Sequence, residues 1–284
     1  MIIWLASYPK SGNTWVRLFL NSLFFTKNGE IDINDIKIGQ FPERKYFNNL
    51  VNDMNDFNEI SRNWIISQQI INLDKKIKFF KTHHAYCKIN DNYFTNSENT
   101  KAVIYIVRDP RNVITSLLNH FDRKNYHDAL EFLLEENRII GKDQFNKVIH
   151  GAEMINLIGS WKNNYNSWKN FPKNLYIIKY EDLVKDPNNE FNKLCDFLSN
   201  LLKIKFDKDR VKQSITLTSF NNLKNQEKKM GFKEAVVSKK SGKKIDFFNL
   251  GPNNNWNIIL NNEIREKIEK NFNKEMLELG YLKR

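Results

Sequence analysis

Cysteine is scarce in this chain of 284 residues. The two cysteines, Cys87 and Cys195, belong to no CxxC pair and to no Cys/His ligand set, so a structural zinc site is not expected. They also provide no disulfide framework, which fits a reducing compartment. The chain lacks the roughly 18 consecutive apolar residues that a membrane-spanning helix needs, and residues 1–10 contain no basic leader. We therefore expect a cytoplasmic protein with no integral membrane segment and no metal ion.

Linker sequence is absent as well. Glycine and proline number only 10 and 6, no Gly/Ser-rich stretch divides the chain, and no internal repeat is visible. The length allows one large domain or two small ones. Because nothing marks a boundary, we expect residues 1–284 to form a single domain.

Acidic residues are too few to balance the basic ones. Lysine and arginine total 45 against 33 aspartates and glutamates, a formal charge of +12. This excess favours an anionic partner, which includes nucleic acid, a membrane surface and a phosphorylated or sulfated small molecule. A general Lys-rich and Asn-rich composition accounts for the same charge without any partner.

Short apolar runs alternate with segments of helical periodicity. Strands are predicted at residues 2–7, 77–83, 102–108 and 175–180, and helices at residues 13–24, 112–121 and 188–200. Alternation of this kind predicts an α/β fold with a central parallel sheet and helices on both faces. The polar, Lys-rich residues 221–247 are expected to form a mobile loop that closes over a ligand.

Polar side chains follow each predicted strand. In folds of this class ligands bind at the carboxyl ends of the strands. Lys10 follows the first strand, Lys81 and His83 the second, and Arg108 the third. We therefore expect one crevice that holds an anion of the phosphate type next to a single titratable base.

The loop after the first strand is the most informative segment. A strand–loop–helix unit directs backbone N–H groups and the positive helix end at an anion. Gly12 permits close approach of the backbone, Lys10 adds a charge and Thr14 adds a hydroxyl donor. The order of residues differs from the GxxxxGK[ST] loop, because here the glycine follows the lysine. A plain strand–helix turn with a surface lysine remains the alternative for this loop taken alone.

Six segments in sequence order carry a resemblance to one enzyme family. They are YPKSGNTW at residues 8–15, KTH at 81–83, the pair Arg108 and Ser116, GSW at 159–161 with Trp168, KYEDL at 179–183 and TSFNNLK at 218–224. Together they resemble the cytosolic-type sulfotransferases, which use 3′-phosphoadenosine 5′-phosphosulfate (PAPS). The resemblance runs from about residue 2 to residue 260. It implies a P-loop-like three-layer α/β fold and transfer of a sulfuryl group to a hydroxyl or amine.

The resemblance also implies roles for individual residues. The residues implied to hold the 5′-phosphosulfate are Lys10, Ser11, Gly12, Asn13 and Thr14. Those implied for the 3′-phosphate are Arg108 and Ser116, with Gly251 retained from a further phosphate-binding loop. Those implied to surround the adenine are Trp15, Tyr180, Thr218 and Phe220.

The family's catalytic residues map to His83 as general base and to Lys10 and Lys81 as charge stabilisers. Phe121 corresponds to an aromatic wall of the acceptor pocket, and Tyr86 is expected to line the same pocket. Two nearby lysines should depress the pKa of His83 and keep its imidazole neutral, hence able to accept a proton. His84 is the competing candidate for the base, and only the KTH register favours His83. The expected product is adenosine 3′,5′-bisphosphate (PAP).

The chain departs from the family at two places. Asn13 stands where the common loop has threonine, and its side-chain amide still offers a hydrogen-bond donor. Near the C-terminus Gly251 and Trp256 remain, but the family's adjacent arginine and lysine are missing. Either the lysines at 239, 240, 243 and 244 supply the charge, or PAPS binds more weakly. No dimerisation motif is recognisable, so no oligomeric state is predicted.

Two other functions compete with sulfotransfer. A kinase-type nucleotide enzyme would need magnesium and a triphosphate, and the reversed Gly/Lys order disfavours it. A basic nucleic-acid-binding protein would bind without a saturable nucleotide site, and the fixed anion-binding residues at the strand ends disfavour it. We expect a small-molecule acceptor and no nucleic-acid partner. A phenol, alcohol, sugar, lipid or amine acceptor is compatible with the sequence.

Overall fold

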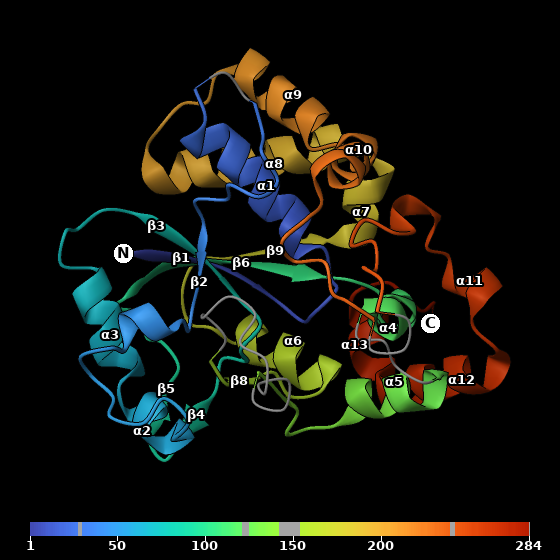
Figure 1. The fold of residues 1–284 in the computed structure, drawn as a ribbon, viewed down its shortest axis with the longest axis horizontal. Helices are drawn as coiled ribbons and strands as arrows, with labels where there is room; N and C mark the ends of the chain where they lie inside the picture. Colours follow the sequence, from blue (N-terminus) through green and yellow to red (C-terminus); the bar gives the residue numbers. More distant parts are fainter. Residues whose placement is uncertain (28–29, 121–124, 142–153, 239–241, 284) are drawn as a thin grey trace. The chain divides into compact units, whose positions relative to one another are not determined.

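The computed structural model describes residues 1–27, 30–120, 125–141, 154–238 and 242–283. Five parallel strands form the central sheet in the order β2-β3-β1-β6-β9 (Figure 1). The four predicted strands are confirmed, with bounds of β1 Ile2–Ser7, β3 Lys78–Thr82, β6 Thr100–Val107 and β9 Leu175–Lys179. The edge strand β2, Gly39–Gln40, has too little apolar sequence to have been predicted.

Burial on both faces explains why these runs form parallel strands. Every residue of β1 is buried, which is typical of a strand covered on both sides. The register pairs Ala6 with Thr82 on one side and with Tyr105 on the other. The carboxyl ends of β1, β3 and β6 therefore end at the same edge of the sheet.

The chain divides into two compact units. The first comprises residues 1–8, 38–106 and 135–177, and the second comprises residues 9–37, 107–134 and 178–284. The boundary falls at or near the carboxyl ends of β1, β6 and β9.

The first unit contains most of the sheet and an aromatic core around Trp4. The Trp4 indole N–H donates to Thr100 Oγ1 at 2.9 Å, and its ring packs against Phe41 and Phe94. The remaining elements of this unit are η1 Arg44–Tyr46, α2 Phe57–Arg62, α3 Trp64–Ile71, β4 Lys88–Ile89, β5 Asn92–Tyr93, β7 Ile139–Ile140, β8 Asn156–Leu157 and α6 Trp161–Lys169.

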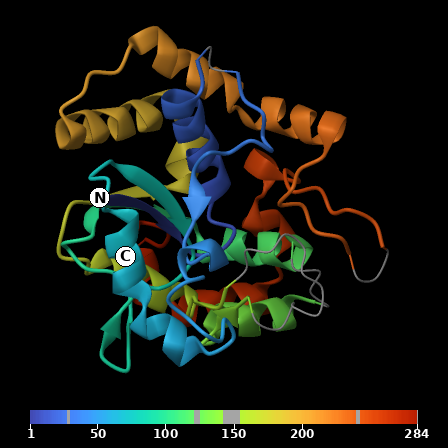
Figure 2. The same cartoon turned by 60° about the vertical axis from the view of Figure 1, so that its left-hand side comes forward.

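The second unit is helical. Its elements are α1 Asn13–Phe25, α4 Pro110–His120, α5 Tyr126–Leu134, α7 Tyr180–Lys185, α8 Pro187–Leu202, α9 Lys208–Leu217, α10 Phe220–Met230, η3 Gly251–Asn253, α11 Trp256–Ile259, α12 Asn262–Asn271 and α13 Asn273–Glu278. The predicted helices correspond to α1, α4 and α8. Figure 2 shows α1, α8 and α9 side by side, and the Phe19 and Phe191 rings stack at 4.0 Å between α1 and α8.

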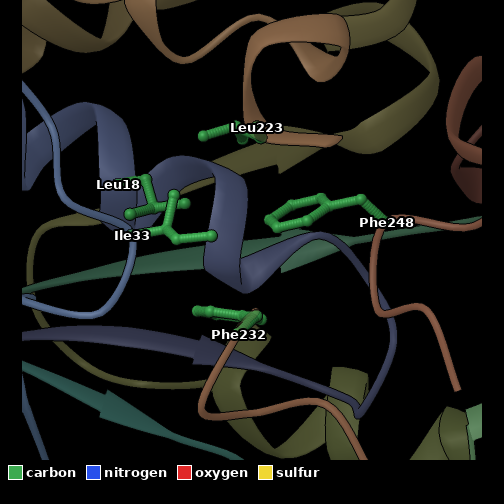
Figure 3. Close-up of a cluster of buried hydrophobic side chains, with 5 residues drawn as sticks. All are labelled: Leu18, Ile33, Leu223, Phe232 and Phe248. Atoms are coloured by element: carbon green, nitrogen blue, oxygen red, sulfur yellow. The ribbon is translucent and has the colours of Figure 1, made fainter. Parts of the chain in front are cut away.

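The expectation of a loop over residues 221–247 is wrong for its first part, because α10 spans Phe220–Met230. Leu223 anchors this helix in a buried cluster with Leu18, Ile33, Phe232 and Phe248 (Figure 3). Although apolar residues are sparse in this part of the chain, Leu223, Phe232 and Phe248 pack against Leu18 of α1, and this packing holds α10 in place.

None of the helices in the described part of the chain is both long enough and apolar enough to cross a bilayer.

Candidate functional site

The loop from Pro9 to Thr14 makes a tight turn into α1. Lys10 and Gly12 both have left-handed backbones, with φ of 67° and 100°. The N–H of Trp15 donates to the Gly12 carbonyl at 3.0 Å, which starts the helix. A Cβ atom at Gly12 would lie 2.5 Å from Cδ2 of Tyr180. Glycine is therefore required here both for its conformation and for the close approach of the tyrosine ring.

The side chains of this loop have defined surroundings. Ser11 is buried, and its hydroxyl has no hydrogen-bond partner among the described residues. The Thr14 hydroxyl donates to Glu234 Oε2 at 3.2 Å. The Lys10 ammonium lies 4.1 Å from the centroid of the Phe247 ring. A buried hydroxyl, a second hydroxyl and a cation at the positive end of a helix form a donor set suited to an anion.

Arg108, directly after β6, contacts this loop. Its Nη1 donates to the Lys10 carbonyl at 3.0 Å, and its Cζ lies 4.1 Å from the centroid of the Tyr180 ring. Burial raises the pKa of Tyr180, and the charge of Arg108 opposes the rise. Within the second unit the structure therefore brings together Arg108, Tyr180 and the turn containing Lys10 and Gly12.

The two carboxylates near Arg108, those of Asp109 and Glu181, accept hydrogen bonds from other residues. Asp109 accepts hydrogen bonds from the guanidinium of Arg111, at 2.6 Å from Nη2. Glu181 accepts from the Asp109 backbone N–H at 3.0 Å and from the Tyr281 hydroxyl at 2.9 Å. Burial raises the pKa of Glu181, and the charge of Arg108 opposes the rise. The sequence motifs do not indicate these hydrogen bonds of Asp109 and Glu181, although Arg111 follows Asp109 in the same RDPR segment.

The four candidate adenine-binding residues are all in the second unit. The Trp15 ring centroid lies 6.0 Å from that of Tyr180, and the Trp15 indole N–H is buried without a hydrogen-bond partner among the described residues. Thr218 is fully buried, and its hydroxyl donates to the Ser214 carbonyl within α9 at 2.7 Å. Phe220 opens α10, and its ring would be 2.2 Å from a Cβ at Gly251, whose φ is 52°.

The segment around Gly251 is attached to α4, the helix that carries the half-buried Ser116. Thr115 Oγ1 donates to Asn254 Oδ1 at 2.7 Å, and the Trp256 N–H donates to Asn112 Oδ1 at 3.0 Å. A cavity of about 430 Å³ adjoins α4, and its lining residues are Thr115, Leu118, Asn119, Tyr126, Ser238, Ile245, Asn249, Leu250 and Ile259. Asparagines and hydroxyls thus hold this segment in place.

Three lysines bear on the missing charge near Gly251. Lys224 is the last residue of the TSFNNLK segment, and it donates to the Asn249 carbonyl at 2.8 Å. Lys243 and Lys244 are exposed, and Lys244 pairs with Val237 in an antiparallel bridge. Residues 239 and 240 lie outside the described residues.

The candidate base, His83, lies in the first unit beside the end of β1. The carbonyl oxygen of Ser7 lies 2.8 Å from His83 Nδ1, and the Ser7 hydroxyl lies 3.2 Å from the same atom. Because a carbonyl oxygen only accepts, Nδ1 carries the hydrogen of the neutral ring, and Nε2 is its basic nitrogen. The His83 carbonyl accepts from Asn164 Nδ2 at 3.0 Å, and Asn164 Oδ1 accepts from the Tyr105 hydroxyl at 2.8 Å.

His84 has a different environment. Its ring is fully buried and stacks on Phe94 with centroids 4.3 Å apart. Desolvation lowers the pKa of His84 to about 4. Its imidazole is therefore a neutral core ring, in contrast to the half-buried His83.

The remaining candidates differ in how they are placed. Lys81 is half-buried near the end of β3. Tyr86 packs on Trp168 and Phe171, with ring centroids 5.7 and 4.9 Å away. Phe121, expected as an acceptor-pocket wall, lies outside the described residues. His83, Lys81 and Tyr86 belong to the first unit and the other described candidates to the second.

The chain is similar to known proteins along most of its length. A family model described as the sulfotransferase domain matches residues 2–280. The chain is 26% identical over 272 residues to flavonol 3-sulfotransferase of Flaveria bidentis, and the matched region covers 94% of this chain and 79% of that protein. The chain is also 26% identical over 196 residues to cytosolic sulfotransferase 1 of Danio rerio, and this matched region covers 69% of this chain but only 58% of that protein's length.

Solved structures give the fold. The crystal structure of mouse sulfotransferase SULT7A1 complexed with PAP superposes with a TM-score of 0.55 at 17% identity, covering 97% of this chain and 84% of that one. At this identity the likeness shows the fold alone, and it confirms the predicted P-loop-like α/β architecture. With the family model spanning nearly all of its length, the chain belongs to the sulfotransferase domain family, and the enzyme class predicted from its motifs is confirmed.

Proposed function

We propose that the protein transfers a sulfuryl group from PAPS to a small-molecule acceptor, with His83 as general base. One observation carries the proposal, namely the clamp formed by Gly12, Arg108 and Tyr180. The Arg108 guanidinium holds the Lys10 carbonyl at 3.0 Å, and the Tyr180 ring fills the space that any side chain at Gly12 would need. Because no side chain covers the backbone at Gly12, the amides of this loop can approach a bound anion directly.

The residues of the loop fit the phosphosulfate end of PAPS. The Ser11 hydroxyl is a buried donor without a partner among the described residues, and Thr14 offers a second hydroxyl in the first turn of α1. Lys10, Asn13 and the loop amides would complete this group. PAPS itself supplies an activated sulfuryl group attached to a phosphate.

The 3′-phosphate would bind to Arg108 and Ser116, and the adenine would lie among Trp15, Tyr180, Thr218 and Phe220. Arginine suits a terminal phosphate because its planar fork donates two hydrogen bonds at once. The Gly251 segment lacks the family's two cations, so Lys224 and the lysines at 239, 240, 243 and 244 are the remaining sources of charge. Losing one charge-assisted contact costs about 1.5–3 kcal/mol, so we propose weaker binding of the 3′-phosphate than two cations would give.

The chain's contribution to proton transfer is assigned to His83. Its Nδ1 hydrogen is directed at the Ser7 carbonyl, 2.8 Å away, so the lone pair of the neutral ring lies on Nε2, which would take the proton of the acceptor hydroxyl. Lys10 and Lys81 would stabilise negative charge on the transferred and bridging oxygens, as positioned cations do in related phosphoryl transfers. His84 is unsuited to the same task because its ring is fully buried.

The acceptor is proposed to be a small molecule with a hydroxyl or an amine. One relative is named for a flavonol, a phenolic compound, and another is named cytosolic. By analogy we propose a cytoplasmic enzyme that acts as one catalytic domain, with Tyr86 and Phe121 near the acceptor and with no nucleic-acid partner.

A thermal-shift comparison tests the nucleotide half of the proposal. PAP should raise the melting temperature in a saturable manner, whereas ATP with magnesium should not, because a ligand stabilises only the state that binds it. The reverse pattern would favour a kinase-type enzyme. Labelled PAPS offered with a panel of phenols, alcohols, sugars and amines would then identify the acceptor class.

A further inference from the structure

The carboxylate of Glu234 lies across the first turns of α1. Thr14 Oγ1 donates to Glu234 Oε2 at 3.2 Å, and Arg17 Nη2 forms an ion pair with Glu234 Oε1. The Arg17 side chain is only 5% exposed, whereas that of Glu234 is 30% exposed. One partner of the pair is therefore fixed inside the protein and the other lies close to solvent.

Thr14 and Arg17 together form an anion-binding pair. They are three residues apart on one helix, so their side chains lie on the same face. A hydroxyl and a guanidinium at the positive end of a helix bind carboxylate, phosphate or sulfonate oxygens through the same hydrogen bonds. In this structure the anion that they bind is one of the chain's own side chains.

We propose that Glu234 is an internal competitor of the nucleotide: it occupies the Thr14 hydroxyl in the free enzyme and must leave it when the anionic end of PAPS or PAP binds. The inference rests on the proposed function, since it takes Thr14 as a ligand of the phosphosulfate. It also gives Arg17 a function, which is to retain the displaced carboxylate beside the loop.

The segment that carries Glu234 is attached firmly enough to present it. Phe232 is buried in the cluster with Leu18, Ile33 and Phe248 (Figure 3). The Lys233 N–H donates to Asn34 Oδ1 at 2.8 Å. Because the backbone is held on both counts, only the Glu234 side chain has to move, and Arg17 can keep one of its oxygens during that movement.

Competition of this kind lowers the apparent affinity by the fraction of molecules in which the site is open. If the carboxylate holds Thr14 in about nine molecules out of ten, nucleotide binding weakens about tenfold. Glu234→Gln keeps the size of the side chain but removes its charge, so it should recover most of that factor.

Titration calorimetry of PAP into the chain of 284 residues tests the proposal. Glu234→Gln should bind PAP about three- to tenfold more tightly than the wild type. Asp246→Asn is the matched control, because it removes the same charge from an exposed position 12 residues further along the chain. It should change the affinity by less than about twofold, as expected for a screened surface charge. Equal or weaker binding of PAP to Glu234→Gln would overturn the inference and indicate that the ion pair is only a structural clamp.

A second background separates competition from general electrostatics. In Thr14→Val the hydroxyl for which the two anions compete is gone, so adding Glu234→Gln should give no further gain in affinity. Thr14→Ser keeps the hydroxyl, and there the gain should persist. A gain of the same size in the valine background would also overturn the inference. If PAP binds to none of the proteins, the proposed function itself fails; if it binds to the wild type and to Glu234→Gln alike, only the competition fails.

Discussion

The Nδ1 atom of His83 lies 2.8 Å from the carbonyl oxygen of Ser7, the last residue of β1. A main-chain oxygen cannot donate, so this contact fixes the neutral tautomer with its hydrogen on Nδ1. The Ser7 hydroxyl, 3.2 Å from the same nitrogen, adds a second restraint on the ring. Two strands of the sheet thus position one imidazole, and the orientation of Nε2 follows from the backbone of the fold.

Replacing His83 should separate chemistry from binding. We expect His83→Ala to lower kcat by about 10²–10⁴-fold, the range for loss of a general base, while the Kd for PAP changes by less than about twofold. Steady-state kinetics with labelled PAPS and calorimetry with PAP measure the two quantities. His127→Ala, an exposed histidine on α5, is the control and should keep full activity. Unimpaired transfer by His83→Ala would remove His83 as the base.

Local sequence signals were sufficient for four of the five strands of the sheet and for the loop after β1. The apolar run of β1 is buried at every position, and the turn at Gly12 uses a left-handed backbone that glycine tolerates. Both depend on a few neighbouring residues, which is why they could be predicted. The choice between His83 and His84 depended on a motif, and burial now gives a physical reason, since the ring of His84 belongs to the core.

Partners distant in sequence could not be predicted. The Arg17–Glu234 pair joins residues 217 positions apart, and the Arg111–Glu269 pair joins residues 158 apart. The local sequence around Arg17 or Arg111 does not indicate its partner, because an arginine in a long-range ion pair and an exposed arginine have the same charge and the same helical periodicity. The helix α10 was missed for a related reason, since its anchor, Leu223, is stabilised by residues from other segments.

Gly12→Ala should abolish tight nucleotide binding. Its Cβ would approach the Tyr180 ring to 2.5 Å, so the ring and the Arg108 guanidinium stacked on it must shift. We expect the affinity for PAP, measured by calorimetry, to fall by more than about tenfold, in line with loss of a charge-assisted contact.

Gly280→Ala is the control for backbone strain in that experiment. Gly280 has a φ of 75°, but nothing lies within 4 Å of a Cβ built there. The substitution should cost about 1 kcal/mol of stability through its left-handed backbone and leave PAP binding unchanged. Equal loss of PAP affinity in both variants would show that the contact with Tyr180 is irrelevant.

Arg108→Lys tests whether geometry or charge matters after β6. The guanidinium both donates to the Lys10 carbonyl and stacks on Tyr180, and an ammonium cannot reproduce the planar stack. We expect the Kd for PAP to rise about ten- to a hundredfold although the charge is kept. Arg210→Lys is the matched control, since Arg210 also donates to a main-chain carbonyl, that of Thr26 at the end of α1. It should lower thermal stability without weakening PAP binding; wild-type affinity in Arg108→Lys would refute the geometric role.

Phe247→Leu should slow sulfuryl transfer by loosening Lys10. The ammonium lies 4.1 Å from the Phe247 centroid, and Glu227 holds the Phe247 N–H at 2.7 Å. A cation–π contact contributes about 1 kcal/mol, so kcat at saturating PAPS should fall roughly fivefold. Tyr93→Leu removes a comparable contact, that of Lys88 at 5.5 Å, from the surface of the other unit. If both substitutions leave kcat unchanged, the ring does not position Lys10.

The buried His84 should make the protein acid-sensitive in a defined window. Burial lowers the pKa of His84 from 6.5 to about 4, so between these values the unfolded chain binds a proton that the folded protein does not. The free energy of unfolding therefore has its full value above about pH 6.5 and decreases as the pH falls towards 4, by about 3 kcal/mol in total. Urea unfolding at several pH values measures this slope. His84→Phe keeps an aromatic ring against Phe94 but cannot titrate, so its stability should vary less with pH across the window, whereas His127→Phe should keep the wild-type dependence. A His84→Phe protein with the full wild-type slope would assign the acid sensitivity to other groups.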